Sequence, residues 1–182
     1  MSRRKLQLVL VVGIMSLLGA VGVAVATGGR DIRERLSGYE EDPLTFSTPA
    51  SGEFKAKLNR SAQEIEWRLT YRDTPTPVTQ AHIHFGGSAQ SGGISVFFCT
   101  NLGNGPAGTQ ACPPAPATIS GTIRPADVIG PVGQGISAGE FDELVSAIRA
   151  GKTYANVHTV ERPGGEIRAQ LELDDSHGHG HW

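Results

Sequence analysis

Three histidines have the type and spacing of metal ligands. His82 and His84 lie two residues apart in an alternating apolar and polar run, and His158 lies in a later run with the same alternation. In an extended strand, residues two apart share one face and are separated by roughly 6.5–7 Å, so two imidazoles can lean onto one ion. Imidazole suits both zinc and copper. His82, His84 and His158 are therefore candidate ligands for one copper or zinc ion.

An interpretation without metal rests on the same alternation. Ala81, Ile83 and Phe85 are expected on the inner face of the first run, which leaves the histidines on its polar outer face. There the imidazoles would hydrogen-bond to polar side chains or to a loop carbonyl. Whether the two histidine strands are neighbours separates the two interpretations.

Three further polar residues are candidates for orienting the ligands. Asn156 lies in the strand of His158, and Glu166 and Arg168 follow in a run that is expected to pair with that strand as a hairpin. They could hold the ligand rings from behind. Alternatively, Glu166 and Arg168 form a surface ion pair, which contributes little stability.

The alternating runs predict an all-β domain of short strands. The runs cover residues 52–58, 64–71, 78–85, 94–99, 117–123, 153–160 and 166–173. One short helix is expected after a capping box formed by Ser137 and Glu140, with its end at Gly151. The sequence therefore predicts an antiparallel β-sandwich or Greek-key barrel, immunoglobulin-like or superoxide-dismutase-like, with one helix on a connection.

The N-terminal segment predicts export. Arg3, Arg4 and Lys5 precede an apolar run from Leu6 to Ala26 that ends in a small-x-small pattern. Residues 1–26 are thus a cleaved signal peptide or an uncleaved membrane anchor, and residues 27–35 are expected to be a tether. Both interpretations place the domain outside the cytoplasm, as a secreted, periplasmic or outward-facing anchored protein. Contact with a membrane is expected only through an uncleaved N-terminal segment.

Two cysteines support the same compartment. Cys99 and Cys112 are the only cysteines in the chain. In an oxidising compartment such a pair is most simply a disulfide. The alternative, two thiol metal ligands, lacks the usual C-x-x-C spacing.

The C-terminal residues 174–182 are predicted to be a flexible tail. The tail carries His177, His179 and His181 on a glycine chain, a composition that chelates transition metals weakly.

Several function classes find no support in the sequence. The formal net charge of −2 gives no reason to expect a nucleic-acid partner. The serines, histidines and aspartates form no nucleophile elbow, and no glycine-rich phosphate loop joins a strand to a helix.

Five motifs in order resemble the CHRD family, whose domain was first described in chordin. They are Leu36-Ser37-Gly38-Tyr39-Glu40-Glu41, Ala81-His82-Ile83-His84, Val96-Phe97-Phe98-Cys99, Asn156-Val157-His158-Thr159, and the run from Pro163 to Leu171. The resemblance covers residues 36–173. It departs from the family at Ala169, where glycine is usual, and after Glu41, where paired prolines are usual. The resemblance implies an exported β-sandwich-like domain that serves as an interaction module in chordin.

We therefore carry three hypotheses. The first is a non-enzymatic, extracytoplasmic CHRD-type module that binds a protein or carbohydrate, with one metal ion at His82, His84 and His158. The second is a copper-dependent redox enzyme on the same residues, because His-x-His on one strand plus a distant histidine is similar to the copper side of Cu,Zn superoxide dismutase. The third is a purely structural envelope module.

Overall fold

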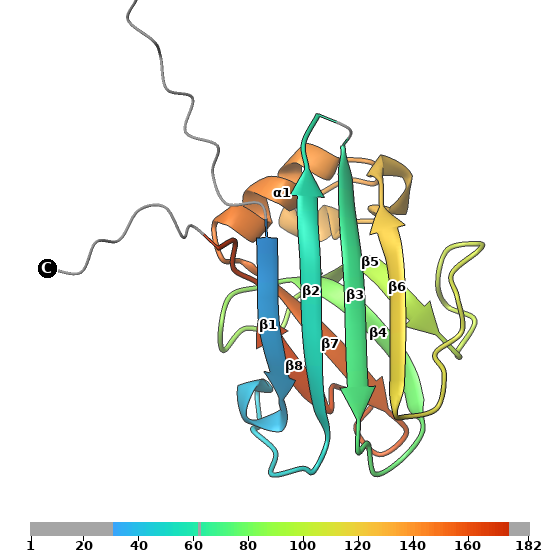
Figure 1. The fold of residues 1–182 in the computed structure, drawn as a ribbon. Coiled ribbons are helices and arrows are strands. Elements are labelled where there is room, and N and C mark those ends of the chain that lie inside the picture. The colour runs from blue at the N-terminus through green and yellow to red at the C-terminus, as the bar shows by residue number, and fades with distance from the viewer. Residues whose placement is uncertain (1–30, 62, 175–182) are drawn as a thin grey trace, which may run out of the picture.

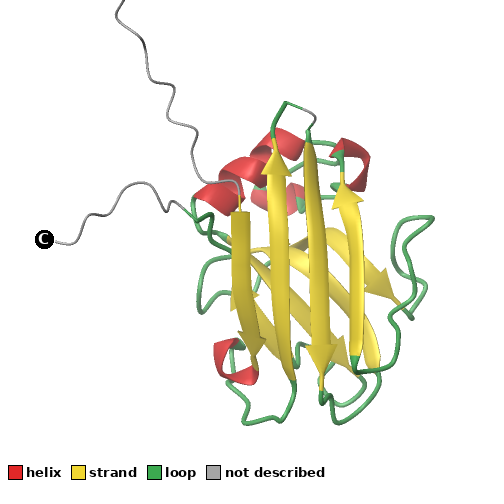
Figure 2. Ribbon diagram, in the orientation of Figure 1, coloured by secondary structure: helices red, strands yellow, loops and turns green. Residues whose placement is uncertain are grey.

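The computed structural model describes residues 31–61 and 63–174. These residues form eight strands, one α-helix and short 3-10 helices (Figures 1 and 2). The strands are β1 (Asp31–Ser37), β2 (Ser51–Asn59), β3 (Glu64–Arg72), β4 (Val78–Phe85), β5 (Gly93–Thr100), β6 (Ala117–Ile123), β7 (Thr153–Thr159) and β8 (Ile167–Gln170). The helices are η1 (Gly38–Glu40), η2 (Pro125–Asp127), η3 (Val132–Gln134) and α1 (Phe141–Arg149).

The eight strands form one antiparallel sheet that is nearly closed into a barrel. Their order is β5-β4-β7-β8-β1-β2-β3-β6. In Figure 1, β1, β2, β3 and β6 form a front layer, and β4, β5, β7 and β8 cross behind it. The pair Ser37 and Arg168 joins the layers between β1 and β8. This architecture confirms the predicted all-β sandwich or barrel with one short helix.

Apolar side chains from both layers fill the space between them. In β3 the alternating residues are buried as predicted: Ile65, Trp67, Leu69 and Tyr71. Phe98 of the back layer contacts front-layer rings, with centroid separations of 5.1 Å to Phe54 and 4.5 Å to Trp67. Burial of such rings is the main favourable term that holds the layers together.

The predicted helix is present and begins after the predicted capping box. The Ser137 amide donates to the Glu140 carboxylate at 2.6 Å, which is one half of that box. Gly139, with φ +87°, turns the chain, and α1 starts at Phe141. Gly151, with φ +61°, follows the helix as the left-handed stop.

The predicted tether 27–35 is wrong for residues 31–35. These residues belong to β1, which pairs with β2 along its whole length. Ile32 and Leu36 are buried, whereas Arg33 and Arg35 are exposed. With only these apolar residues the alternation is weak in the sequence, and pairing with β2 stabilises the strand.

The predicted disulfide joins Cys99 and Cys112. Neither sulfur is a free thiol, so the alternative that the two cysteines are metal ligands is wrong. The loop that it closes is also tied by Asn101. Asn101 accepts a hydrogen bond from the Cys112 amide at 3.0 Å and donates to the Cys112 carbonyl at 2.9 Å.

Some sequence predictions lie outside the described residues. These are the signal peptide or anchor at 1–26, the remaining tether at 27–30 and the tail histidines His177, His179 and His181. Within residues 31–61 and 63–174, no helix combines the length and the hydropathy needed to cross a bilayer.

We predict that the disulfide stabilises the fold mainly by restricting the unfolded chain. The cysteines are 13 residues apart. The Cys99→Ser/Cys112→Ser variant should therefore lose about 3 kcal/mol of unfolding free energy. Urea denaturation followed by circular dichroism measures the loss, and reduced wild-type protein is the control. Equal midpoints for oxidised, reduced and substituted protein would contradict the prediction.

Candidate metal centre

Strand register brings the three histidines to one face of the back layer. β4 pairs with β7, so that His82 lies opposite Asn156 and His84 lies opposite Tyr154. His158 is two residues beyond Asn156 and therefore shares this face of β7. The two histidine strands are thus neighbours, which is the condition that the metal interpretation requires.

Loops cover this face. The exposed fractions of the histidines are 0% for His82, 8% for His84 and 5% for His158. Ala81 and Ile83, which alternate with them, are buried in the core on the opposite face. The sequence therefore places the imidazoles on the correct side of β4, but it does not reveal that loops bury that side.

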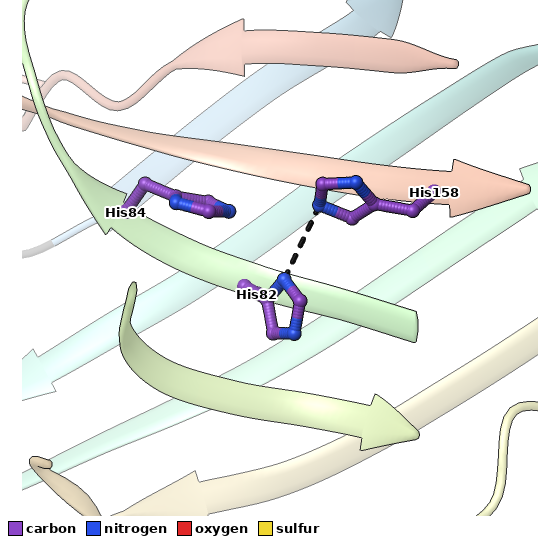
Figure 3. Close-up of side chains that lie close together, drawn as sticks. All are labelled: His82, His84 and His158. Atoms are coloured by element: carbon purple, nitrogen blue, oxygen red, sulfur yellow. Dashed lines mark hydrogen bonds between the residues drawn. The ribbon is translucent and has the colours of Figure 1, made fainter. Parts of the chain in front are cut away.

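The three rings converge between β4 and β7 (Figure 3). One ligand nitrogen from each ring lies within 4.8 Å of the other two. His82 Nδ1 and His158 Nε2 lie 3.2 Å apart. Around a tetrahedral ion at 2.0–2.1 Å, ligand nitrogens are roughly 3.4 Å apart. Small side-chain shifts would thus bring all three nitrogens onto one ion.

Backbone carbonyls fix the orientation of two rings. His84 Nδ1 lies 2.9 Å from the Gly92 carbonyl oxygen, and His158 Nδ1 lies 3.0 Å from that of Pro163. Because a carbonyl only accepts, both Nδ1 atoms carry the proton, and both Nε2 atoms have a free lone pair when the ring is neutral. A hydrogen bond from the far nitrogen of a histidine to a carbonyl is typical of metal ligands.

The tautomer of His82 follows from that of His158. Since His158 Nε2 is unprotonated, His82 Nδ1 must donate the hydrogen bond between them. His82 Nε2 and His84 Nε2 are buried without a hydrogen-bond partner among the described residues. Buried nitrogens without a partner are rare in folded proteins. Here they show that the polar atoms of the cluster are not all satisfied by the described residues.

Burial holds the histidines in the neutral, ligand-competent form. It lowers the pKa of His82 to about 2, and the neighbouring His158 and His84 lower it further. It also lowers the pKa of His84 and of His158 to about 4, although the carbonyl hydrogen bonds oppose that shift. At neutral pH a metal ion would meet neutral rings and would not have to displace the second proton of an imidazolium.

Asn156 and Glu166 belong to neighbouring networks. Asn156 donates to the Glu41 carboxylate at 2.7 Å. Glu166 accepts hydrogen bonds from Thr159, at 2.9 Å, and from Thr48. In the described part of the chain, no hydrogen bond joins either residue to an imidazole.

Arg168 reaches the histidines through an aromatic stack. Its guanidinium lies 3.5 Å from the centroid of the Tyr154 ring, and that ring stacks on His84 with centroids 4.9 Å apart. Arg168 also donates to the Gly87 and Gln90 carbonyls at 2.7 and 3.2 Å. The predicted β7–β8 hairpin is confirmed, because Asn156 pairs with Arg168 in the register.

The alternative of a surface ion pair between Glu166 and Arg168 is wrong. Both side chains are buried, and among the described residues neither forms a salt bridge. The loops over this face exclude solvent from both residues, and hydroxyls and carbonyls satisfy them instead.

Several contributors to the site are missed by the sequence reasoning. The Gly92 and Pro163 carbonyls have no side-chain signature, so no pattern could reveal them. The Phe97 ring packs perpendicular to the His82 ring, with centroids 4.3 Å apart, and Tyr154 stacks on His84. Glu41 carries a sequence signal, because it ends the motif Leu36-Ser37-Gly38-Tyr39-Glu40-Glu41 at the start of the domain.

Glu41 is a buried carboxyl at the edge of this polar layer. Its exposed fraction is 7%. Burial raises the pKa of Glu41 to about 7, against the opposing effects of the Asn156 hydrogen bond and the Arg168 charge. The nearby Glu166 charge raises the pKa as well. Ionising Glu41 in the folded protein is therefore costly.

We predict that Glu41→Gln stabilises the protein at alkaline pH. Wild-type stability should fall as pH rises from about 4.5 to about 7, because the folded carboxyl keeps a proton that the unfolded chain gives up. The neutral amide should raise the unfolding free energy at pH 8 by roughly 3 kcal/mol and change it little at pH 4. Denaturant titrations at both values test this, with exposed Glu40→Gln as the control. Equal effects at pH 4 and 8 would contradict it.

We predict the opposite pH trend for the histidines. Because their folded pKa values are lowered, the unfolded chain binds protons first, and stability should be lost as pH falls below about 6.5 toward 4. Melting curves of metal-free Glu41→Gln protein isolate this effect. With His158→Gln added, the melting temperature should fall less steeply as the pH is lowered, because one of the three histidines has been removed. A melting temperature that stays constant from pH 7.5 to 5 would show that the imidazoles are not held neutral.

Comparison with known proteins identifies a family but no individual relative. The family model for the CHRD domain matches residues 33–171, which is most of the chain. Neither the curated proteins nor the solved structures contain a match.

Proposed function

The chain belongs to the CHRD domain family, and on this premise we propose that it is an exported binding module that holds one copper or zinc ion at His82, His84 and His158. The observation that carries the proposal is the convergence of three neutral imidazole nitrogens within 4.8 Å of one another. Carbonyls hold two of the rings by their far nitrogens, which supports a built site over a chance cluster.

The donor set limits the metals that fit. All three donors are imidazoles, which suit zinc and copper and are poor partners for calcium or magnesium. Three protein ligands leave a fourth position on a tetrahedral ion for water or a ligand. On binding, His82 would give up its Nδ1 proton and carry a proton on Nε2 instead. That switch would leave a buried N–H at His82 Nε2 without an acceptor among the described residues, a cost that coordination has to exceed.

Export is supported by two independent features. The basic and apolar N-terminal segment has the composition of a signal or anchor. The Cys99–Cys112 disulfide is typical of oxidising compartments outside the cytoplasm. On this proposal the domain works in the envelope or the extracellular space, where it meets an unidentified protein or carbohydrate partner.

A copper-dependent redox enzyme is the second candidate. It is favoured by the arrangement of His-x-His on β4 with His158 on the neighbouring strand of a nearly closed barrel. The described residues offer no second group of three metal-ligating side chains, so this candidate would use a single ion. The third candidate, a structural module, would use the histidines only for packing.

We predict that the chain binds one ion through the β4–β7 histidines. The test protein is the full-length chain in neutral detergent, with His177, His179 and His181 replaced by alanine so that the tail cannot bind metal. Calorimetric titration with zinc or copper should give one ion per chain. Loss of a ligand in His84→Ala or His158→Ala should weaken binding by at least about 100-fold. Tyr154→Phe is the graded control: it keeps the ring that stacks on His84 and removes only the hydroxyl that accepts from the Gly92 amide, so it should weaken binding less than the loss of a ligand.

The outcomes separate the three candidates. Stoichiometric binding that is lost in the histidine variants and kept in Tyr154→Phe supports the module. Superoxide dismutation by the copper-loaded protein that disappears in His158→Ala would favour the redox enzyme. Protein that takes up neither ion, although circular dichroism shows it folded, would refute metal binding and leave the structural candidate.

A further inference from the structure

The outer face of β1, β2, β3 and β6 concentrates basic side chains. This layer faces the viewer in Figure 1, with none of the described elements in front of it. Half of the lysines and arginines in residues 31–174 project from it: Arg33, Arg35, Lys55, Lys57, Arg68 and Arg72. Residues 31–174 hold more acidic than basic side chains. By the same register Asp31, Glu53, Glu64 and Glu66 project from this layer as well, so it carries six basic against four acidic side chains. The layer therefore has a net positive charge that residues 31–174 as a whole do not have.

Strand register sets three of these cations in one row. Arg33 pairs with Lys55, Lys55 pairs with Arg68, and Arg68 pairs with Ser120. Like charges directly opposite each other destabilise a sheet, so this row does not serve stability. Lys55 has a partner in Glu53 at 2.8 Å. Arg33 and Arg68 form no ion pair with any described residue.

The row lies in a shallow depression. Its volume is about 480 Å³, and its lining includes Arg33, Lys55 and Arg68 together with the hydroxyls of Ser120 and Thr122. A second depression of about 510 Å³ on the same layer is lined by residues that include Arg35, Arg72 and Thr70. Asp31 and Glu66 also line the first depression and Glu53 lines the second, so cations, carboxylates and hydroxyls are interspersed over this surface. A ligand that carries both anionic groups and hydroxyls would find partners for both kinds of group there.

We propose that this face binds a linear anionic polysaccharide, whose sulfate or carboxylate groups pair with Arg33, Lys55 and Arg68. Neighbouring strands lie roughly 4.8 Å apart, so the row offers one cation at each such interval across the sheet. The serine and threonine hydroxyls beside the row can hydrogen-bond to sugar hydroxyls. The proposal is independent of the metal site, which lies on the outer face of the other layer.

Two other polyanionic surfaces fit less well. The exposed large apolar side chains of the described residues all lie outside β1, β2, β3 and β6, so this face has none to insert into a membrane. For the same reason it offers no exposed aromatic ring on which a nucleic-acid base could stack.

Binding to dextran sulfate tests the proposal, with unsulfated dextran as the neutral control. The full-length chain in neutral detergent should bind immobilised dextran sulfate, and the affinity should fall as salt rises. Arg33→Ser/Arg68→Ser should weaken binding roughly tenfold, the sum of two exposed charge contacts. The matched control is Arg149→Ser/Lys152→Ser, which removes the same charge from the exposed end of α1 and the turn that follows it and should change affinity less than about twofold.

Parallel measurements use polygalacturonate, phosphatidylglycerol vesicles and single-stranded DNA. Polygalacturonate should bind in the same variant-dependent way. Three results would overturn the proposal: no binding to either polysaccharide at low salt, an equal loss in both double variants, or tighter binding to the vesicles or the DNA. Circular dichroism of each variant confirms that the fold is intact, because all four substituted side chains are exposed.

Discussion

The constraint on which the site depends is the burial of three imidazoles against one another, with no carboxylate of the described residues paired to them. A buried histidinium would lack solvation and would face two more rings, so the cluster must be neutral. Neutral rings in turn need partners for their N–H groups. The Gly92 and Pro163 carbonyls meet that need for two of them. The third ring can only donate to a neighbour, which leaves lone pairs unsatisfied in the interior.

The loops that cover the histidines supply the polar groups that neutral, buried rings require. Loops after β1, β4 and β7 supply carbonyls, hydroxyls and the Glu41 carboxyl above the outer face of the back layer. Arg168 is held there by loop carbonyls and by the face of Tyr154. A positive charge held close to the cluster further disfavours protonation of His84. The same layer therefore keeps the imidazoles dry, oriented and uncharged.

Much of the fold and part of the site can be read from the sequence. The alternation in β3 or β4 is set by the core, so it reports both the strand and the face on which each residue lies. β1 is not predicted from the sequence, because most of its residues are charged and the strand is stabilised by pairing with β2. The site is predictable in its histidines, which have a distinctive spacing. Its backbone partners cannot be predicted, because any residue can supply a carbonyl. The sequence also does not predict the loops that bury His82.

A long-range proton–nitrogen NMR spectrum of the histidine side chains, recorded without metal and with one equivalent of zinc, tests the central claim most directly. The sample is the full-length chain with the tail histidines replaced. Our account predicts three neutral rings at pH 7, with His84 and His158 protonated on Nδ1. It predicts that zinc shifts the Nε2 signals of those two rings and the Nδ1 signal of His82. Protonated imidazolium rings, or signals that zinc leaves unchanged, would contradict the account.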